Sequence, residues 1–197
     1  MRSGAARARH RPAYTHLLDK ANAGRLLDPD GPTRVLRHDE PALDTRYRLQ
    51  ETPEYTLALI CNFDQIRSGA GWHLLARARN RCGKEIKLGD APLENGRPVT
   101  IPKASAQNML VVGRIQLEPS LVWRILDFAI KPPVSTLILH GVNYRLVPGT
   151  AGGPILLHLA PALGWSPEPD QVIDAQVIGL DHYSGSARIT FYEIPVS

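Results

Sequence analysis

Short apolar runs separated by Pro and Gly fill the second half of the chain. They occupy residues 109–117, 135–140, 144–147, 154–159, 171–180 and 187–194. Each run has the length of a strand, and turn residues follow at short intervals. That rhythm is typical of a β-sandwich or barrel.

The strand rhythm predicts the fold class. We expect about ten strands and one or two short helices, a number that suits two packed antiparallel sheets. The expected fold is therefore all-β, an antiparallel β-sandwich of jelly-roll type, with a closed barrel as the second choice. Residues 1–54 would form an N-terminal tail, a short helix and a wrapping loop, and residues 55–197 the sandwich domain. An apolar share of 43% in 197 residues is enough to bury a core.

The formal net charge of +4 comes largely from the first residues of the chain. Arg2, Arg7, Arg9 and Arg11 form a basic N-terminal arm, and the remainder is close to neutral. We interpret the arm as an untethered terminus, with an arm that grips RNA, an acidic surface or a neighbouring copy as the alternative. The charge alone makes nucleic-acid binding an unfavoured interpretation.

The first third of the chain holds fewer strand patterns. Residues 14–24 predict a short helix that Gly24 ends, and residues 27–47 read as an extended loop over the body. The nearly continuous apolar run 55–63 predicts a buried strand. Residues 72–79 alternate in part, as a strand does, and 122–130 fits a helix slightly better than a strand.

Two turns in the second half predict hairpins. One would pair residues 136–139 with 144–147, and the other would join the last two strands through Tyr183. The glycine-rich segment 148–154 lacks the Gly-Lys-Ser/Thr ending of a phosphate-binding loop, so we interpret it as a connection between strands.

The two cysteines, Cys61 and Cys82, have no metal-binding spacing. We favour two buried free thiols; the alternative is one disulfide between neighbouring strands, which would require an oxidising compartment. No signal peptide and no long apolar run is visible, so we expect a soluble protein that is cytoplasmic if the chain is full-length. For a fragment, the compartment cannot be read.

Aromatic and basic residues near strand ends are the candidates for ligand binding. A core position is the commoner role for a tryptophan such as Trp72, but an indole at a strand edge can also stack on a sugar ring. Trp165 lies in a Pro/Gly loop, where burial is less automatic. The candidate ligand-binding residues are Arg67, Trp72, His73, Arg145, Trp165 and Tyr183.

Three histidines near strand ends are weak candidates for a metal site: His140, His158 and His182. They lack the His-x-His spacing of cupin-type metal sites, so we expect neither a metal nor another cofactor. No nucleophile motif of a hydrolase is present, and no catalytic residue is assigned.

The sequence favours a non-catalytic recognition module, most plausibly for carbohydrate or as an accessory to a carbohydrate-active enzyme. The first alternative is a structural protein of capsid or fibre type that associates with its own copies through the basic arm. The second is a cupin-like metal enzyme. We expect no membrane partner.

Overall fold

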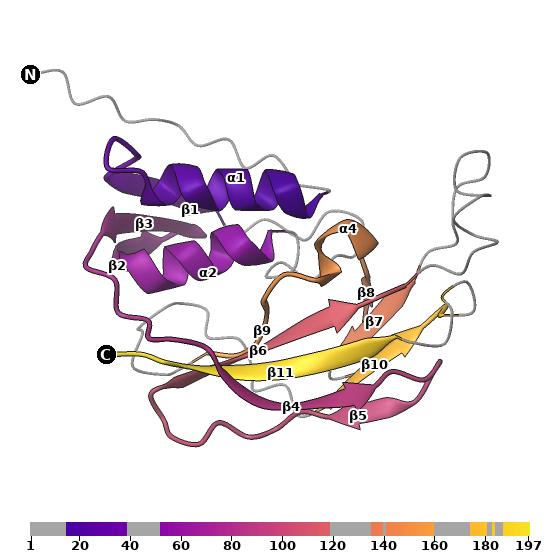
Figure 1. Ribbon diagram of the computed structural model, residues 1–197. Helices are drawn as coiled ribbons and strands as arrows, with labels where there is room; N and C mark the ends of the chain where they lie inside the picture. The colour runs from indigo at the N-terminus through magenta and orange to yellow at the C-terminus, as the bar shows by residue number, and fades with distance from the viewer. Residues whose placement is uncertain are drawn as a thin grey trace, which may run out of the picture.

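The computed structural model describes residues 15–38, 52–118, 135–139, 141–159, 174–180, 183 and 187–197. The described chain is mostly β-structure, in three antiparallel sheets with a few short helices. Figure 1 places the helices α1 and α2 side by side at one end of the molecule, next to the smallest sheet. The long strands β6 and β11 run past them.

The elements follow one another in this order: α1 (His16–Leu27), β1 (Arg34–His38), α2 (Pro53–Asn62), β2 (Phe63–Gly69), β3 (Trp72–Arg77), β4 (Ile86–Pro92), β5 (Pro98–Thr100), β6 (Met109–Gln116), β7 (Thr136–Leu139), β8 (Val142–Arg145), α4 (Pro148–Ala151), β9 (Ile155–His158), β10 (Asp174–Ile178) and β11 (Arg188–Pro195).

The strands β4 to β11 form two four-stranded sheets. One has the order β4-β11-β6-β9 and the other β5-β10-β7-β8. The pairing is nested: β7 pairs with β8, β6 with β9, β5 with β10, and β4 with β11. We call these two sheets the body. A chain folded in this way behaves as one long hairpin whose two arms stay paired along their length.

The inner core of the body takes residues from both of its sheets. Val111 and Ile115 of β6 meet Leu137 of β7 and Val177 of β10 in one cluster. The alternate residues of β6, such as Val112, belong to a second cluster on the other side of the strand. Because β6 is buried on both faces, its sequence is a nearly continuous apolar run, as fully covered strands usually are.

The second cluster joins the body to an N-terminal layer, which we define as α1, α2 and the sheet β1-β3-β2. Val35, Leu75 and Phe63 point from this sheet into the cluster, and Leu59 of α2 lies among them. The sheet takes strands from both sides of the domain division expected near residue 55.

The two helices are joined by a carboxylate. Asp19 of α1 accepts hydrogen bonds from the backbone N–H groups of Glu54 (2.8 Å) and Tyr55 (3.1 Å), in the first turn of α2. In most helices, a polar side chain of the N-cap residue of the same helix accepts hydrogen bonds from these N–H groups. Here the N-cap residue Thr52 makes no such bond, and its buried hydroxyl has no hydrogen-bond partner among the described residues. Asp19 therefore caps α2 from the neighbouring helix.

Two arginines donate hydrogen bonds to the carbonyl groups at the C-terminal ends of the same helices. Arg77 donates to the carbonyl oxygens of Leu26 (2.5 Å) and Asp28 (2.9 Å) at the end of α1. Arg81 donates to the carbonyl oxygen of Ile60 at the end of α2. The last carbonyls of a helix lack partners within the helix, so a guanidinium with several donors can satisfy them.

Cys61 and Cys82 form a disulfide, with their Cα atoms 5.2 Å apart. The prediction of free thiols is therefore wrong. Cys61 lies in the last turn of α2, and Cys82 forms a β-bridge with Val196 just beyond β11. The alternative prediction, a disulfide between two neighbouring strands, is correct about the bond but wrong about its position, because Cys61 lies on a helix. The bond connects the N-terminal layer to the end of the body.

The predicted strand at 55–63 is wrong, since these residues form α2. Pro53 occupies its first turn and Glu54 supplies the acidic residue favoured there. The apolar run stays buried because α2 is covered by α1 and by the body. A short helix buried on several sides cannot be told from a buried strand by its apolar pattern alone.

Other predictions are confirmed or corrected. The helix predicted over 14–24 exists but passes Gly24 and ends at Leu27, and β1 lies within the segment read as a loop. The hairpin from 136–139 is confirmed, with its second strand at Val142–Arg145. The last two strands do not pair with each other, because β10 and β11 belong to different sheets. The segment 148–154 contains the short helix α4. The predictions for 1–12 and 122–130 lie outside the described residues.

Candidate functional site

The small sheet β1-β3-β2 has one face turned away from the cores. Its strands pair in register, with Leu36 opposite Leu74 and His38 opposite Trp72. On the other side of β3, Arg67 is opposite Leu74. Side chains two residues apart on a strand share a face. We call the face that carries these residues, together with Arg34 of β1, the outer face.

The outer face exposes large apolar side chains. Leu36 is 52% exposed and Trp72 46%, and Ile66, in the irregular step of β2, is 53% exposed. The opposite face of the same sheet contributes Val35 and Leu75 to the core, where they are 3% and 0% exposed. Leu36 and Trp72 are therefore two large apolar groups exposed on the same face of one small sheet.

Trp72 is held by a neighbouring ring. Its centroid lies 4.3 Å from that of His38, with the two planes tilted by 44°. The turn before Trp72 makes room for this contact. Ala70 (φ 51°) and Gly71 (φ 76°) both adopt left-handed conformations, as the tight turn of a two-residue hairpin requires. A Cβ on Gly71 would lie 3.4 Å from Nε2 of His38. The indole is therefore supported on one side and open to solvent on the other.

Two arginines on the outer face have no partner in the described structure. Neither Arg34 nor Arg67 makes an ion pair or a side-chain hydrogen bond with the residues that the structure describes. Both are exposed. Asp64, the acidic residue on β2, is already paired with Arg81 at 2.6 Å. The face thus combines an open indole with unneutralised positive charge.

The structure brings together two of the predicted ligand-binding residues. Trp72 and Arg67 share the outer face, and the core interpretation of Trp72 is wrong. His73 lies on the opposite face and is 5% exposed, so it faces the layer's interior. The buried side chains of β3 are His73 and Leu75, and Trp72 lies on the opposite face of the strand. Trp72 is therefore exposed and not part of the core.

The remaining candidates lie elsewhere. Arg145 is on β8, an edge strand of the body, and Tyr183 packs partly buried against the inner core. Trp165 lies outside the described residues. The predicted set therefore does not form one site.

The candidate metal ligands are not assembled in the described part of the chain. There, no group of three or more His, Cys, Asp or Glu residues is placed to hold a metal ion. His158 is half-buried on β9, and burial lowers the pKa of its imidazole. His140 and His182 lie outside the described residues.

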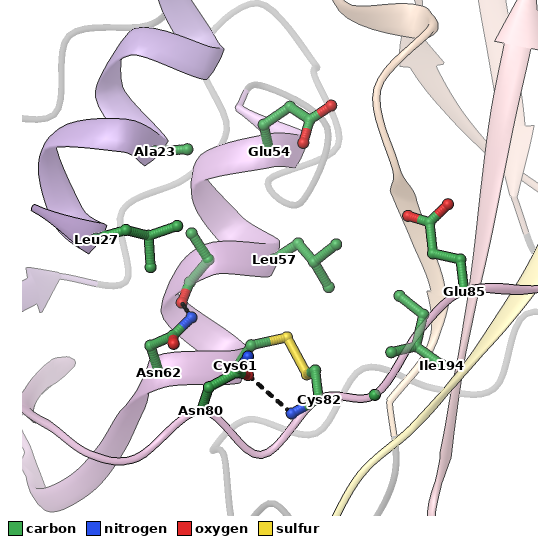
Figure 2. Close-up of a pocket in the computed structure, with 12 residues that line it drawn as sticks. Ala23, Leu27, Glu54, Leu57, Cys61, Asn62, Asn80, Cys82, Glu85 and Ile194 are labelled. Atoms are coloured by element: carbon green, nitrogen blue, oxygen red, sulfur yellow. Dashed lines mark hydrogen bonds between the residues drawn. A yellow bond between two sulfur atoms is a disulfide. The ribbon is translucent and has the colours of Figure 1, made fainter.

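A groove of about 260 Å³ runs between the N-terminal layer and the body (Figure 2). Its walls carry Leu57 and Ile194, the Cys61–Cys82 disulfide lies at one end, and Glu54 and Glu85 lie toward the other.

Both carboxylates of the groove already have cationic partners. Arg114 of β6 contacts Glu85 at 2.6 Å and Glu54 at 3.5 Å, and His16 lies 3.1 Å from Glu54. The groove consequently offers a ligand mainly apolar surface, and its ionic groups serve to connect the layer to β6.

Sequence reasoning missed the β1 contribution to the outer face. Arg34, Leu36 and His38 were placed in a loop because the surrounding prolines and charges obscure a short strand. The sequence of β1 shows no clear alternation of apolar and polar residues, because Val35 and Leu36 are adjacent although they lie on opposite faces. The strand becomes recognisable only once its partner strand is known.

Comparisons with known proteins give no further guide. A scan against protein-family models, a search of curated proteins and a search of solved structures each found no match to this chain. No helix in the described part of the chain is both long and apolar enough to span a bilayer.

Proposed function

We propose that this protein is a non-catalytic recognition protein that binds carbohydrate on the outer face of the β1-β3-β2 sheet. The observation that carries the proposal is Trp72, whose indole is about half exposed, is supported by His38 and shares its face with Arg67, which forms no ion pair with the described residues. Aromatic side chains with one apolar face and polar neighbours suit ligands that have both apolar and hydroxyl surfaces. Sugar rings have both.

The body would act as a rigid scaffold for such a face. The nested pairing of β4–β7 with β8–β11 and the core shared by two four-stranded sheets favour a β-sandwich of jelly-roll type. That arrangement occurs in lectin domains and in capsid proteins, so it is compatible with recognition but does not select it.

The disulfide bears on the compartment. Disulfides persist in oxidising environments and are rare in the cytosol. The Cys61–Cys82 bond therefore favours an oxidising compartment, and it weighs against the cytoplasmic location expected from the sequence. Extracellular or periplasmic surroundings would also give access to glycans.

A glycan-binding experiment with one substitution tests the proposal. The wild-type protein, screened on an array of oligosaccharides, should bind a defined subset. Trp72→Ala should weaken that binding by about 5- to 150-fold, since one aromatic stacking contact contributes about 1 to 3 kcal/mol. Ile178→Ala is the matched control, because Ile178 is similarly exposed (42%) on a different sheet. Equal affinities of wild type and Trp72→Ala would remove the proposal.

A second candidate function is assembly with copies of the same chain. The strand order of the body favours it, because jelly rolls with this pairing build capsids. Light scattering over a range of concentrations separates the two functions: a monomer at the highest concentration would exclude assembly and leave the recognition proposal untouched.

A further inference from the structure

We infer that the carbohydrate bound by the outer face is acidic, carrying carboxylate or sulfate groups. The inference rests on the proposed function and adds the charge of the ligand. It is drawn from the arginines of the face, which have no acidic partner among the described residues, and from their position relative to Trp72.

Most arginines of the described chain already have partners. Arg97 pairs with Glu94, Arg114 with Glu85 and Arg188 with Asp90. Other arginines bind backbone carbonyls, as Arg77 and Arg81 do. Arg34, Arg67 and Arg79 are the described arginines without an ion pair or a hydrogen bond, and two of these three are on the outer face.

The pairing register gives the spacing of these charges. From strand geometry, the Cα of Arg67 lies about 8 Å from that of Trp72, and the Cα of Arg34 about 14 Å from it. A ring stacked on Trp72 would thus have one guanidinium within side-chain reach. The second lies farther along β3, where another part of the same chain of sugars would pass.

The space between the charges is apolar. Leu36 and Leu74 lie side by side in the middle of the face. This pattern suits a ligand whose charges are separated by rings with apolar faces. A guanidinium presents donors in a planar fork that matches a carboxylate or sulfate, so two arginines can select an acidic sugar over a neutral one. A nucleic acid carries a phosphate at every nucleotide and would use a continuous row of cations instead.

The test compares acidic oligosaccharides with their uncharged counterparts. Uronate oligosaccharides and sulfated oligosaccharides are the probes; their methyl-esterified and desulfated forms keep the rings and lose the charge. We expect the acidic forms to bind at least about tenfold more tightly at low salt, and the difference to shrink as salt rises, because exposed charges are screened.

Three variants assign the preference to this face. The double variant Arg34→Gln/Arg67→Gln should remove the preference for the acidic forms while keeping the weaker affinity for the neutral ones. Trp72→Ala should weaken both. The double variant Arg97→Gln/Arg188→Gln is the charge-matched control, since both arginines are exposed and lie outside this sheet, and it should change neither. Thermal unfolding of each variant checks that the fold is kept.

The possible failures are distinguishable. Equal binding of acidic and neutral forms, abolished by Trp72→Ala, would overturn the acidic preference and leave the proposed function standing. The absence of any glycan binding would overturn both. Binding of RNA and acidic glycans alike, lost in the arginine variant but unaffected by Trp72→Ala, would identify a general polyanion surface and would also overturn the inference.

Discussion

The N-terminal layer and the body are each stabilised by a different combination of contacts. In the body, the inner core is built from alternating apolar residues of adjacent strands, such as Val111, Val177 and Ile189. In the layer, a covalent bond and charged side chains add connections to the apolar cluster that it shares with the body. Asp19 caps α2, Arg77 binds the end of α1, and the Cys61–Cys82 bond anchors α2.

The difference has a physical reason. Small units of two short helices and three strands usually need cross-links in addition to their apolar core. The body has eight strands and a long register between β6 and β11. The layer also carries the outer face, so its rigidity decides how firmly Trp72 and Arg67 are held for a ligand.

The largest effect should come from breaking the disulfide. The double variant Cys61→Ala/Cys82→Ala removes a bond that closes a loop across a sequence separation of 21. A loop of about 20 residues corresponds to about 3 kcal/mol of lost stability. If the layer opens separately, amide hydrogens of α2 and β3 should exchange up to about 100-fold faster, while those of β6 and β11 should not.

Hydrogen exchange measured residue by residue distinguishes the two possibilities. Adding reductant to the wild type should reproduce the effect, and adding it to the double variant should have none. An equal increase in the exchange rates of β6 and α2 would mean that the layer and the body unfold as one cooperative unit. The two regions would then differ in the contacts that stabilise them but not in how they unfold.

The next effect should come from Arg77. Arg77→Gln leaves the carbonyl oxygens of Leu26, Asp28 and Pro32 without their guanidinium donors. Unsatisfied, partly buried acceptors should lower the unfolding free energy by about 2 to 3 kcal/mol. The control Arg97→Gln removes an ion pair in which both partners are exposed, and should change it by less than about 1 kcal/mol.

Urea unfolding of both variants gives the comparison. Similar small losses would show that Arg77 contributes no more than a surface arginine, and the capping interpretation of the layer would be wrong. Arg77→Lys should recover only part of the loss, because an ammonium group cannot reach three carbonyls with a planar fork.

The two regions also differ in how much of them could be predicted. The strands of the body follow from local apolar runs, and β6 and the β7–β8 hairpin were predicted close to their observed positions. The layer depends on contacts between distant residues: the apolar run in α2 fits a helix or a strand, and only Asp19 and Pro53 decide it. Trp72 and Arg67 were predicted as ligand residues, but their common face appears only with the register of β2 and β3.

A test of the body uses two glycines on either side of Phe191. Gly113 of β6 and Gly89 of β4 are both paired with this residue. A Cβ on Gly113 would lie 2.9 Å from Cδ1 of Leu157 and 3.1 Å from Cδ1 of Ile189, whereas a Cβ on Gly89 would meet nothing within 4 Å. Gly113→Ala should therefore cost about 1 to 3 kcal/mol through overpacking, and Gly89→Ala should be neutral or slightly stabilising.

Thermal unfolding of the two glycine variants provides the measurement. A neutral Gly113→Ala would indicate that the inner core is packed loosely enough to accept a methyl group. The body would then resemble the layer in depending on connections other than close apolar packing.

The smallest effect, and the one whose size depends on pH, concerns Asp19. Asp19→Ala removes both hydrogen bonds to the start of α2 and should lower stability by about 1 to 2 kcal/mol near neutral pH. Burial raises the pKa of the Asp19 carboxyl above its usual value, although the two backbone N–H groups oppose this shift. The folded protein therefore keeps a proton on Asp19 at pH values where the unfolded chain has already released it.

It follows that the stability contributed by Asp19 is fully present below a pH of about 3.8, the ordinary value for this carboxyl, and decreases as the pH rises through the raised pKa of the folded state. The difference in unfolding free energy between wild type and Asp19→Ala should thus be larger at pH 4 than at pH 7. A difference that instead grows toward pH 7 would mean that the N–H groups of α2 outweigh the burial of Asp19, and that the charged carboxylate is the form that stabilises the layer.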